Sequence, residues 1–475
     1  MIEGIKPYPA YKDSGVPWLG DVPEDWGISA FRAVARARKG RQPASLMGHG
    51  GGDTGGVPYL SMEFLRSPGN SPSEFAAPQD DLVIADYDDT VLLWDGANAG
   101  EFLKAKSGAV SSTSALIVPH SGHRRFFFHA CKLAEPTLRA LTVGMGIPHV
   151  DGDVLKGIRF PAPPLPEQAA IVRFLDHADR RIRGSLTAKR KLIALLNEQK
   201  QAIIHHAVTR GLDPNVRLKA SGVESLGDVP EHWQVRRIAS FSPKITNGWV
   251  GPTRDILQDN GVPYIQSLHV KQGRIRFEKK YFVAADWLTA RSKICLRRGD
   301  VVVVQTGDIG QVACVPPEFD GAGCHALIII RTDPLVISGQ FLDLALRSRY
   351  GFDSLKSVQT GALHPHLNCT WVREIFVPIP GVSEQQAIVG RVAEETGALD
   401  SMISIVERED FFLREYRARL ISDIVTGKLD VRDAAARLPE DVEELAPPDD
   451  LDALAEGDQS DDEGDVDAAF VEDEN

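Results

Sequence analysis

The chain has 475 residues, and at about 150 residues per domain this length predicts two to four domains. Its 43% hydrophobic and 25% charged residues are typical of a globular protein with a packed core. The formal charge of −13 is unevenly spread, because residues 439–475 contain 17 Asp or Glu and no Lys or Arg, which leaves residues 1–438 at about +4. The acidic total therefore does not exclude nucleic-acid binding by the body of the chain.

The N-terminal residues do not resemble a signal peptide, because no basic stretch precedes an apolar one. Apolar runs such as Val301–Val304 and Ala326–Ile330 are much shorter than the ~20 residues that span a bilayer. The five cysteines lack CxxC spacing, which argues against a disulfide framework. We therefore expect a cytoplasmic protein with no membrane attachment.

In chain order, the first recognisable feature is a leading segment that occurs twice. Residues 11–26 read YKDSGVPWLGDVPEDW and residues 218–233 read LKASGVESLGDVPEHW, with 11 of 16 positions identical. Two further matches follow in the same order: GVPYL at 56–60 with GVPYI at 261–265, and IRFPAPPLPEQAAIV at 158–172 with IFVPIPGVSEQQAIV at 375–389. The chain is predicted to be two tandem copies of a unit of about 210 residues, a pseudo-two-fold internal repeat.

The first part of each copy contains short β-type runs separated by Gly, Pro, Asn and Asp, which predicts a small, strand-rich domain of the α/β class. The middles of the two copies share only strand-like patches, Leu82–Ala85 with Val301–Val304 and Ala115–Val118 with Ala326–Ile329. A shared framework with two different middles predicts two similar domains that bind different targets.

The second part of each copy begins with closely spaced prolines, which suit an extended lead-in but not a helix interior. A sustained heptad pattern then predicts a helix of about 40 residues, about 60 Å long, in each copy. An ordinary core helix is the alternative, but this length exceeds a small domain and favours two helices packed on each other. The predicted seam is Ile171, Leu175, Ile182, Leu192, Leu196 and Ile203 in the first helix, and Ile388, Val392, Leu399, Val406, Leu413 and Leu420 in the second.

These features predict five segments along the chain. Residues 1–160 and 213–378 are the two domains, residues 161–212 and 379–432 contain the long helices, and residues 433–475 form an acidic tail. The tail is expected to be disordered and solubilising, because like charges repel and remain solvated. An autoinhibitory mimic of DNA is the alternative for this segment.

No set of catalytic residues is recognisable. The glycine run Gly48–Gly56 lacks the lysine of a P-loop, and Glu278-Lys279-Lys280 lacks the upstream acid of a nuclease motif. His205 and His206 would point about 100° apart on a helix, and His364-Pro365-His366 lacks a further ligand at zinc spacing. The tetrapeptides expected of an amino-methylating DNA methyltransferase are also missing. We predict neither a catalytic nor a metal site.

The duplicated motifs together resemble the specificity subunit of type I restriction-modification systems, over about residues 8–432. They are Pro-Glu-x-Trp at 23–26 and 230–233, Pro-x-Pro followed by Glu-Gln at 161–168 and 378–385, the helix ends at 208–213 and 425–430, and the stretch 361–367. The second copy departs slightly, with Gly381 after its Pro-x-Pro where the first copy has proline.

The resemblance implies a non-catalytic DNA specificity subunit. Each of two target-recognition domains would bind one half of a split, asymmetric site in double-stranded DNA, and the helices would form an antiparallel coiled coil that separates the domains. Two modification subunits, which use S-adenosylmethionine, and restriction (translocase/nuclease) subunits would assemble on this chain, which itself would bind no cofactor. Two alternatives remain open: a single-chain restriction or modification enzyme, and a coiled-coil scaffold that binds proteins.

DNA-contacting residues are predicted from chemistry, because Lys and Arg bind phosphates while Arg, Lys, Asn and Gln read base edges. The alternative for each residue is a solvated strand face. The candidates are Arg36, Arg38, Lys39, Arg41, Lys104 and Lys106 in the first domain, and Lys271, Gln272, Arg274, Arg276, Lys279, Lys280, Gln305, Thr306, Gln359 and Thr360 in the second.

Overall fold

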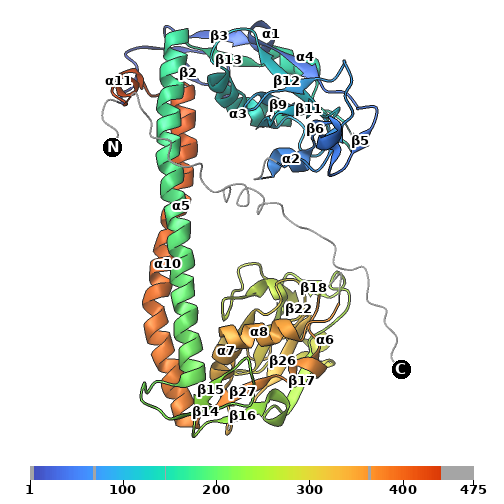
Figure 1. Cartoon of the computed structure of the whole chain (residues 1–475), viewed down its shortest axis with the longest axis vertical. Coiled ribbons are helices and arrows are strands. Elements are labelled where there is room, and N and C mark those ends of the chain that lie inside the picture. The colour runs from blue at the N-terminus through green and yellow to red at the C-terminus, as the bar shows by residue number, and fades with distance from the viewer. Residues whose placement is uncertain (1–4, 68–70, 145, 362–364, 440–475) are drawn as a thin grey trace. The chain divides into compact units, whose positions relative to one another are not determined.

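The computed structural model describes residues 5–67, 71–144, 146–361 and 365–439, which fall into two compact units. The first unit contains the described residues up to Arg190 and those from Arg408 onward, and the second contains Lys191–Glu407. Two long helices, α5 (Leu165–Arg210) and α10 (Val382–Val425), contribute to both units (Figure 1).

The first unit contains a four-stranded antiparallel sheet in the order β10-β9-β12-β4 and a second sheet in the order β5-β7-β6-β11-β8, in which β6 and β11 are parallel. Helix α3 packs against β10 and β13 (Figure 1). The strands are β1 (Tyr11–Asp13), β2 (Asp21–Pro23), β3 (Gly27–Ala30), β4 (Ala35–Lys39), β5 (Leu46–Met47), β6 (Val57–Leu60), β7 (Phe75–Ala76), β8 (Ile84–Ala85), β9 (Thr90–Leu93), β10 (Phe102–Lys104), β11 (Gly108–Val110), β12 (Ser114–Pro119) and β13 (Arg159–Ala162). The shorter helices are α1 (Phe31–Val34), α2 (Met62–Arg66), α3 (Arg124–Ala140), α4 (Gly152–Gly157) and α11 (Arg432–Ala436).

The second unit has sheets in the orders β17-β26-β23-β24 and β18-β22-β19-β25, and a separate hairpin of β20 and β21. Helix α7 covers β23 and β24 and is followed directly by α8. The strands are β14 (Leu218–Ala220), β15 (Asp228–Pro230), β16 (Gln234–Arg237), β17 (Lys244–Asn247), β18 (Leu257–Gln258), β19 (Val262–Ile265), β20 (Val270–Lys271), β21 (Arg274–Ile275), β22 (Phe282–Val283), β23 (Val301–Val304), β24 (Val312–Cys314), β25 (Gly323–Cys324), β26 (Leu327–Arg331) and β27 (Phe376–Ile379). The shorter helices are α6 (Ala285–Thr289), α7 (Gly339–Arg347), α8 (Arg349–Ser357) and α9 (Cys369–Val372).

The two units repeat the same strand order, including the middles that share little sequence. Strands β24-β23-β26-β17 correspond to β10-β9-β12-β4, and β18-β22-β19-β25 correspond to β5-β7-β6-β11. One predicted pairing was wrong: the counterpart of Val301–Val304 is Thr90–Leu93, because both are fully buried central strands, whereas Ile84–Ala85 is an edge strand of the other sheet. The predicted fold class, two strand-rich α/β domains and two long helices packed antiparallel, is confirmed.

The antiparallel packing of α5 and α10 is visible in their ion pairs. Lys189 pairs with Glu409 and Asp179 pairs with Arg417 in the first unit, while Lys200 pairs with Asp400 in the second. Residue numbers thus fall along α10 as they rise along α5. Apolar contacts accompany these pairs, for example those among Leu196, Leu399 and Ile403.

The predicted heptad seam is displaced in places. Most of its residues are buried, and Ile203 and Leu413 are half-buried, but Leu192 is 41% exposed. The neighbouring positions Ile193 and Ile204 also make packing contacts, although they lie outside the predicted seam. A straight helix drifts by about 20° per heptad relative to a 3.5-residue repeat, so strict counting by seven moves off the buried face.

The motif residues of each copy meet where a long helix begins. Trp26 and Trp233 are completely buried, and each donates its indole N–H to a glutamate Oε1, of Glu167 and Glu384 respectively, at 3.0 Å. The glutamine that follows each glutamate bonds backbone groups of the same unit: Gln168 accepts from the N–H of His123 at 2.8 Å, and Gln385 accepts from that of Ser338 at 2.9 Å. The repeated motifs therefore anchor each domain to its long helix.

The first residues of the predicted disordered tail are helical in the structure. Residues 433–436 are part of α11, where Ala434 and Ala435 are buried against the first unit's core, so the prediction was wrong for this stretch. The segment around Lys6 lies beside this helix, because the backbones of Lys6 and Asp430 bond to each other. The remainder of the predicted tail, from residue 440, lies outside the described residues. Within the described chain, none of the helices is both apolar and long enough to cross a membrane.

Candidate nucleic-acid interface

The basic cluster of the first unit lies on an edge strand. Arg36, Arg38 and Lys39 are exposed on β4, which has a neighbour on one side only. Lys39 pairs with Asp95 at 2.9 Å, and Arg41, just beyond the strand, pairs with Asp81 at 2.5 Å. No acidic partner is seen for Arg36 or Arg38 in the part of the chain that the structure describes. Basic residues on an edge strand also prevent the strand from pairing with other chains, so the exposure of these residues does not by itself identify a DNA-binding surface.

The second basic pair of this unit lies at the opposite edge of the same sheet. Lys104 ends β10 and pairs with Asp88 at 2.6 Å. Lys106 donates to the backbone carbonyl of Ser67 at 2.7 Å and lies 4.5 Å from the centre of the Phe64 ring. The structure thus separates these lysines from the β4 cluster.

In the second unit, the basic run forms the hairpin β20–β21, whose two-residue turn is Gln272-Gly273. Both turn residues have positive φ, 51° and 78°, as a tight primed turn requires. A Cβ at Gly273 would lie 2.4 Å from Cζ of Arg347, so the turn packs closely on α7. Lys271 pairs with Asp308 at 2.9 Å, and the N–H of Gln272 donates to Oε1 of Gln311 at 3.0 Å.

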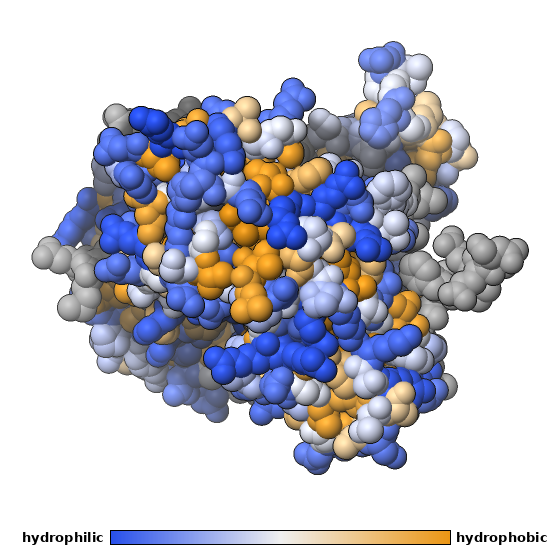
Figure 2. All heavy atoms as spheres, turned by 90° about the horizontal axis from the view of Figure 1, so that it is seen from below, coloured by the Kyte–Doolittle hydropathy of each residue, from blue (hydrophilic) through white to orange (hydrophobic). Residues whose placement is uncertain are grey.

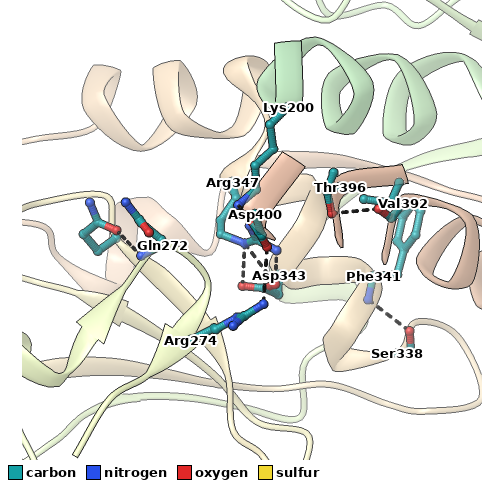
Figure 3. A network of polar contacts seen from close by, with 11 residues as sticks. Lys200, Gln272, Arg274, Ser338, Phe341, Asp343, Arg347, Val392, Thr396 and Asp400 are labelled. Carbon is teal, nitrogen blue, oxygen red and sulfur yellow. Dashed lines mark hydrogen bonds and ion pairs between the residues drawn. The ribbon is translucent and has the colours of Figure 1, made fainter. Parts of the chain in front are cut away.

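Arg274 points from this hairpin toward α10 (Figure 3). Asp400 accepts from Arg274 at 3.3 Å and also pairs with Lys200 of α5, so one carboxylate joins the hairpin to both helices. The other hairpin candidates, Arg276 and Lys280, are exposed. Lys279 lies with its Nζ 5.8 Å from the Tyr281 ring centre, and its carbonyl faces Nε2 of His269 at 2.7 Å.

An open cleft of about 960 Å³ lies beside this contact, and basic side chains outnumber acidic ones in its lining. It is lined by Arg297 and Arg298, whereas the lining residues Arg331 and Arg347 pair with Asp300 and Asp343. Burial raises the pKa of the Asp343 carboxyl to about 6, although the adjacent Arg347 opposes the shift. Several basic candidates at the hairpin and cleft therefore have acidic partners within the protein. Arg276 and Lys280, in contrast, present their charge to solvent.

Two of the polar candidates, Thr306 and Thr360, meet at one histidine. Gln305 and Thr306 follow β23, and Gln359 and Thr360 follow α8. The backbone of His366 bridges to both Thr306 and Thr360, and its Nε2 lies 3.1 Å from Oγ1 of Thr360. His364 lies outside the described residues, and among the described residues no group of three potential ligands is placed to hold a metal.

Sequence reasoning missed several residues of these sites. Asp400 gave no signal, because its role depends on the packing of α10 against the hairpin. His149 of the first unit was also missed, although it precedes His366 by 217 residues, the offset of the surrounding repeat. Asp95 and Val143 flank His149 through backbone bridges as Thr306 and Thr360 flank His366.

Comparisons with known proteins agree on one family. A model of the type I restriction modification DNA specificity domain matches residues 23–193. The type I restriction enzyme MjaVIII specificity subunit of Methanocaldococcus jannaschii is 29% identical over 421 residues, a match that covers 86% of this chain and 94% of the relative. The EcoBI specificity subunit of Escherichia coli is 25% identical over 289 residues, 59% of this chain and 60% of the relative. A chain from a solved structure of complex assembly in the type I R-M system has the same fold, with a TM-score of 0.60 at 15% identity, over 85% of this chain and 98% of the other.

Proposed function

This chain belongs to the family of type I restriction-modification DNA specificity subunits, and we propose that each of its two units binds one half of a bipartite, asymmetric DNA site. As a specificity subunit it is a non-catalytic part of a type I enzyme complex that acts on DNA. The DNA sequence that the complex acts on is set by this subunit.

One observation carries the proposal: the same strand order is built twice with different side chains at its surface. The edge strand of the first four-stranded sheet presents Arg36 and Arg38, whereas the corresponding edge strand β17 contains Lys244 and Asn247. Phosphate contacts need only basic groups, while base contacts need particular donors and acceptors in particular places. Two like frameworks with unlike surfaces suit two DNA half-sites of different sequence.

The long helices are proposed to dock two modification subunits, which carry S-adenosylmethionine, and restriction subunits would join the resulting complex. Exposed apolar side chains support this proposal, because such groups are frequent at protein interfaces. In the first unit, Phe411, Phe412 and Tyr416 of α10 are exposed, and in the second unit Leu195 and Ile405 are exposed. Figure 2 views the molecule from below, along the long helices as Figure 1 draws them, and apolar patches lie among hydrophilic side chains on that end face as well.

We assign the protein to the cytoplasm, where its DNA and partner subunits would be available. The described cysteines are all free thiols, as expected in a reducing compartment.

Reconstitution tests the proposed function. The purified chain, mixed with a modification subunit, S-adenosylmethionine and random duplex DNA, should direct methylation to one bipartite sequence. The chain without its partner should transfer no methyl group; if it did, the single-chain enzyme would be the better assignment. The absence of sequence-dependent DNA binding, even with the modification subunit present, would favour a protein-binding scaffold instead.

The helices are further proposed to set the spacer between the half-sites. Because Trp233 is bonded to Glu384 at the start of α10, unit two is attached to both helices, and both must be lengthened together. Four residues inserted after Arg190 and four after Glu407 would extend the pair by about 6 Å and rotate it by about 40° beyond a full turn. One base pair adds about 3.4 Å and about 35°. The preferred spacer should therefore grow by one or two base pairs with unchanged half-sites, and an unchanged spacer would show that the helices do not set it.

A further inference from the structure

A three-segment backbone arrangement recurs in both units at the edge where the central strand leaves the four-stranded sheet. In the first unit, Asp95 follows β9, Val143 follows α3, and His149 lies between them with backbone bridges to both. In the second unit, Thr306 follows β23, Thr360 follows α8, and His366 bridges to both. We call each arrangement the exit cluster of its unit, defined by these three residues.

The hydrogen bonds of the two exit clusters coincide closely. The N–H of Val143 donates to the carbonyl of His149 at 3.0 Å, with the reverse bond at 2.8 Å. Thr360 and His366 form the same two bonds at 3.0 Å and 2.8 Å. The residue after each histidine then donates to the residue that follows the central strand: Val150 to Trp94 at 2.9 Å, and Leu367 to Gln305 at 3.0 Å.

The side chains on this shared backbone differ, except for the histidine. The second residue after the central strand is Asp95 in one unit and Thr306 in the other, and the bridging position is Val143 or Thr360. Packing does not explain the choice of polar groups, because His149 and Thr360 are exposed and Asp95 is only partly covered. The arrangement is a constant frame that presents variable polar groups at one edge.

Positive charge lies next to each exit cluster. In the first unit, Nζ of Lys39 lies 2.9 Å from Asp95 and 5.7 Å from the centre of the Trp94 ring. In the second unit, Lys271 of the hairpin pairs with Asp308, two residues beyond Thr306. Lysines suit phosphate contacts, and the adjacent carboxylate, hydroxyl and imidazole groups suit base edges.

Two buried glutamine atoms flank the second cluster. Among the described residues, Oε1 of Gln305 and Nε2 of Gln359 find no hydrogen-bond partner. Each glutamine directly precedes a threonine of the cluster, Thr306 or Thr360. A buried amide atom without a partner costs free energy, so packing does not explain the polar character of this corner of the unit.

We infer that the exit clusters are the base-reading edges of the two units, with His149 and His366 making an equivalent contact in each half-site and Asp95 and Thr306 making the contact that differs. Asp95 would accept from an exocyclic amino group, as on cytosine, whereas Thr306 serves either a donor or an acceptor. This inference rests on the proposed function and adds the residues that determine specificity.

The test uses the full chain with its modification subunit and duplexes that vary one half-site at a time. His149→Ala should weaken binding roughly 5- to 100-fold through the first unit's half-site, and His366→Ala should do so through the other half-site only. Asp95→Thr, which places the second unit's residue at the same backbone position, should change the preferred base in the first half-site. His120→Ala, an exposed histidine of the first unit outside the cluster, is the matched control and should leave affinity unchanged.

Folding effects are separated by thermal unfolding and by binding to random DNA, both of which should stay at the wild-type level. If His149→Ala, His366→Ala and Asp95→Thr all bind every half-site as the wild type does, the inference is overturned while the proposed function stands. An equal loss on specific and random DNA would also overturn it, because the clusters would then support folding or phosphate binding. If the wild-type complex itself shows no sequence preference, the proposed function fails first.

Discussion

Charge reversal at Arg274 and Arg276 is expected to weaken DNA binding and to flatten its dependence on salt. Arg274 lies on β21 of the hairpin, and Arg276 directly follows this strand. The Arg274 side chain is 70% exposed despite its contact with Asp400. An exposed ion pair contributes only about 0–1 kcal/mol, so losing this contact should barely affect folding. Each phosphate contact contributes about 0.9 to the slope of log affinity against log salt, so two lost contacts reduce the slope by about 1.8.

The assay is an anisotropy titration of the cognate duplex with the chain and its modification subunit at several salt concentrations. Between 50 and 200 mM salt, the affinity of Arg274→Glu/Arg276→Glu should fall by about tenfold less than that of the wild type. Asp400→Asn is the matched control, because it removes the partner of Arg274 and leaves the charge of the hairpin intact. This control should keep the wild-type slope.

Two results would refute the reasoning. An unchanged slope in the double reversal would remove the hairpin from the DNA face. If Asp400→Asn reproduced the loss of affinity, Arg274 would act by fixing the hairpin to α10 and not through phosphate contact.

Three further predictions concern stability and the tail. In a denaturant titration, Trp233→Phe should lower the free energy of unfolding by about 2–4 kcal/mol, because it removes a buried hydrogen bond to Glu384 and leaves a void. The control Trp371→Phe, at an exposed position, should have little effect. Burial lowers the pKa of His129 to about 4, so between pH 6.5 and pH 4 the unfolded chain binds a proton that the folded chain excludes. The free energy of unfolding should therefore fall as pH decreases from 6.5 toward 4, by at most about 3 kcal/mol from this residue. In unfolding curves at several pH values, His129→Gln should reduce that loss. Deleting residues 440–475 should leave specific DNA binding unchanged, because the acidic composition of this segment predicts that it does not pack on the rest of the protein. Tighter binding after truncation would support an autoinhibitory DNA mimic instead.

The sequence predicted the architecture well where a local pattern decides the structure. The all-valine run 301–304 forms β23 as expected, because a short apolar run bounded by turn residues suits a buried strand. Its counterpart was misassigned, since Leu82–Ala85 is also apolar and only the pairing of strands distinguishes an edge from a centre. The predicted burial of Leu192 was wrong for a similar reason, because the burial of a helix position depends on how the partner helix packs against it.

The sequence indicated which residues could contact DNA, but not how these residues are arranged in space. Gln305, Thr306, Gln359 and Thr360 were each chosen for their chemistry, but the meeting of Thr306 and Thr360 at His366 depends on backbone contacts between segments that are distant in sequence. Arg274 was chosen for its charge, and its contact with Asp400 follows from the packing of the hairpin on α10, which no local pattern indicates. Two sequence signals connect His149 with His366: the repeat offset, and the Pro-His-aliphatic sequence shared by residues 148–150 and 365–367.

The central claim is that this chain gives its complex two different half-site specificities, one from each unit. The most direct measurement is to map methylated bases in DNA modified by the reconstituted complex, first with the wild-type chain and then with a chain in which residues 213–378 are replaced by those of another family member. The account predicts one bipartite motif with a fixed spacer, and the replacement should change one half-site while the other half and the spacer stay the same. A continuous motif, or a change in both halves after replacing one unit, would contradict it.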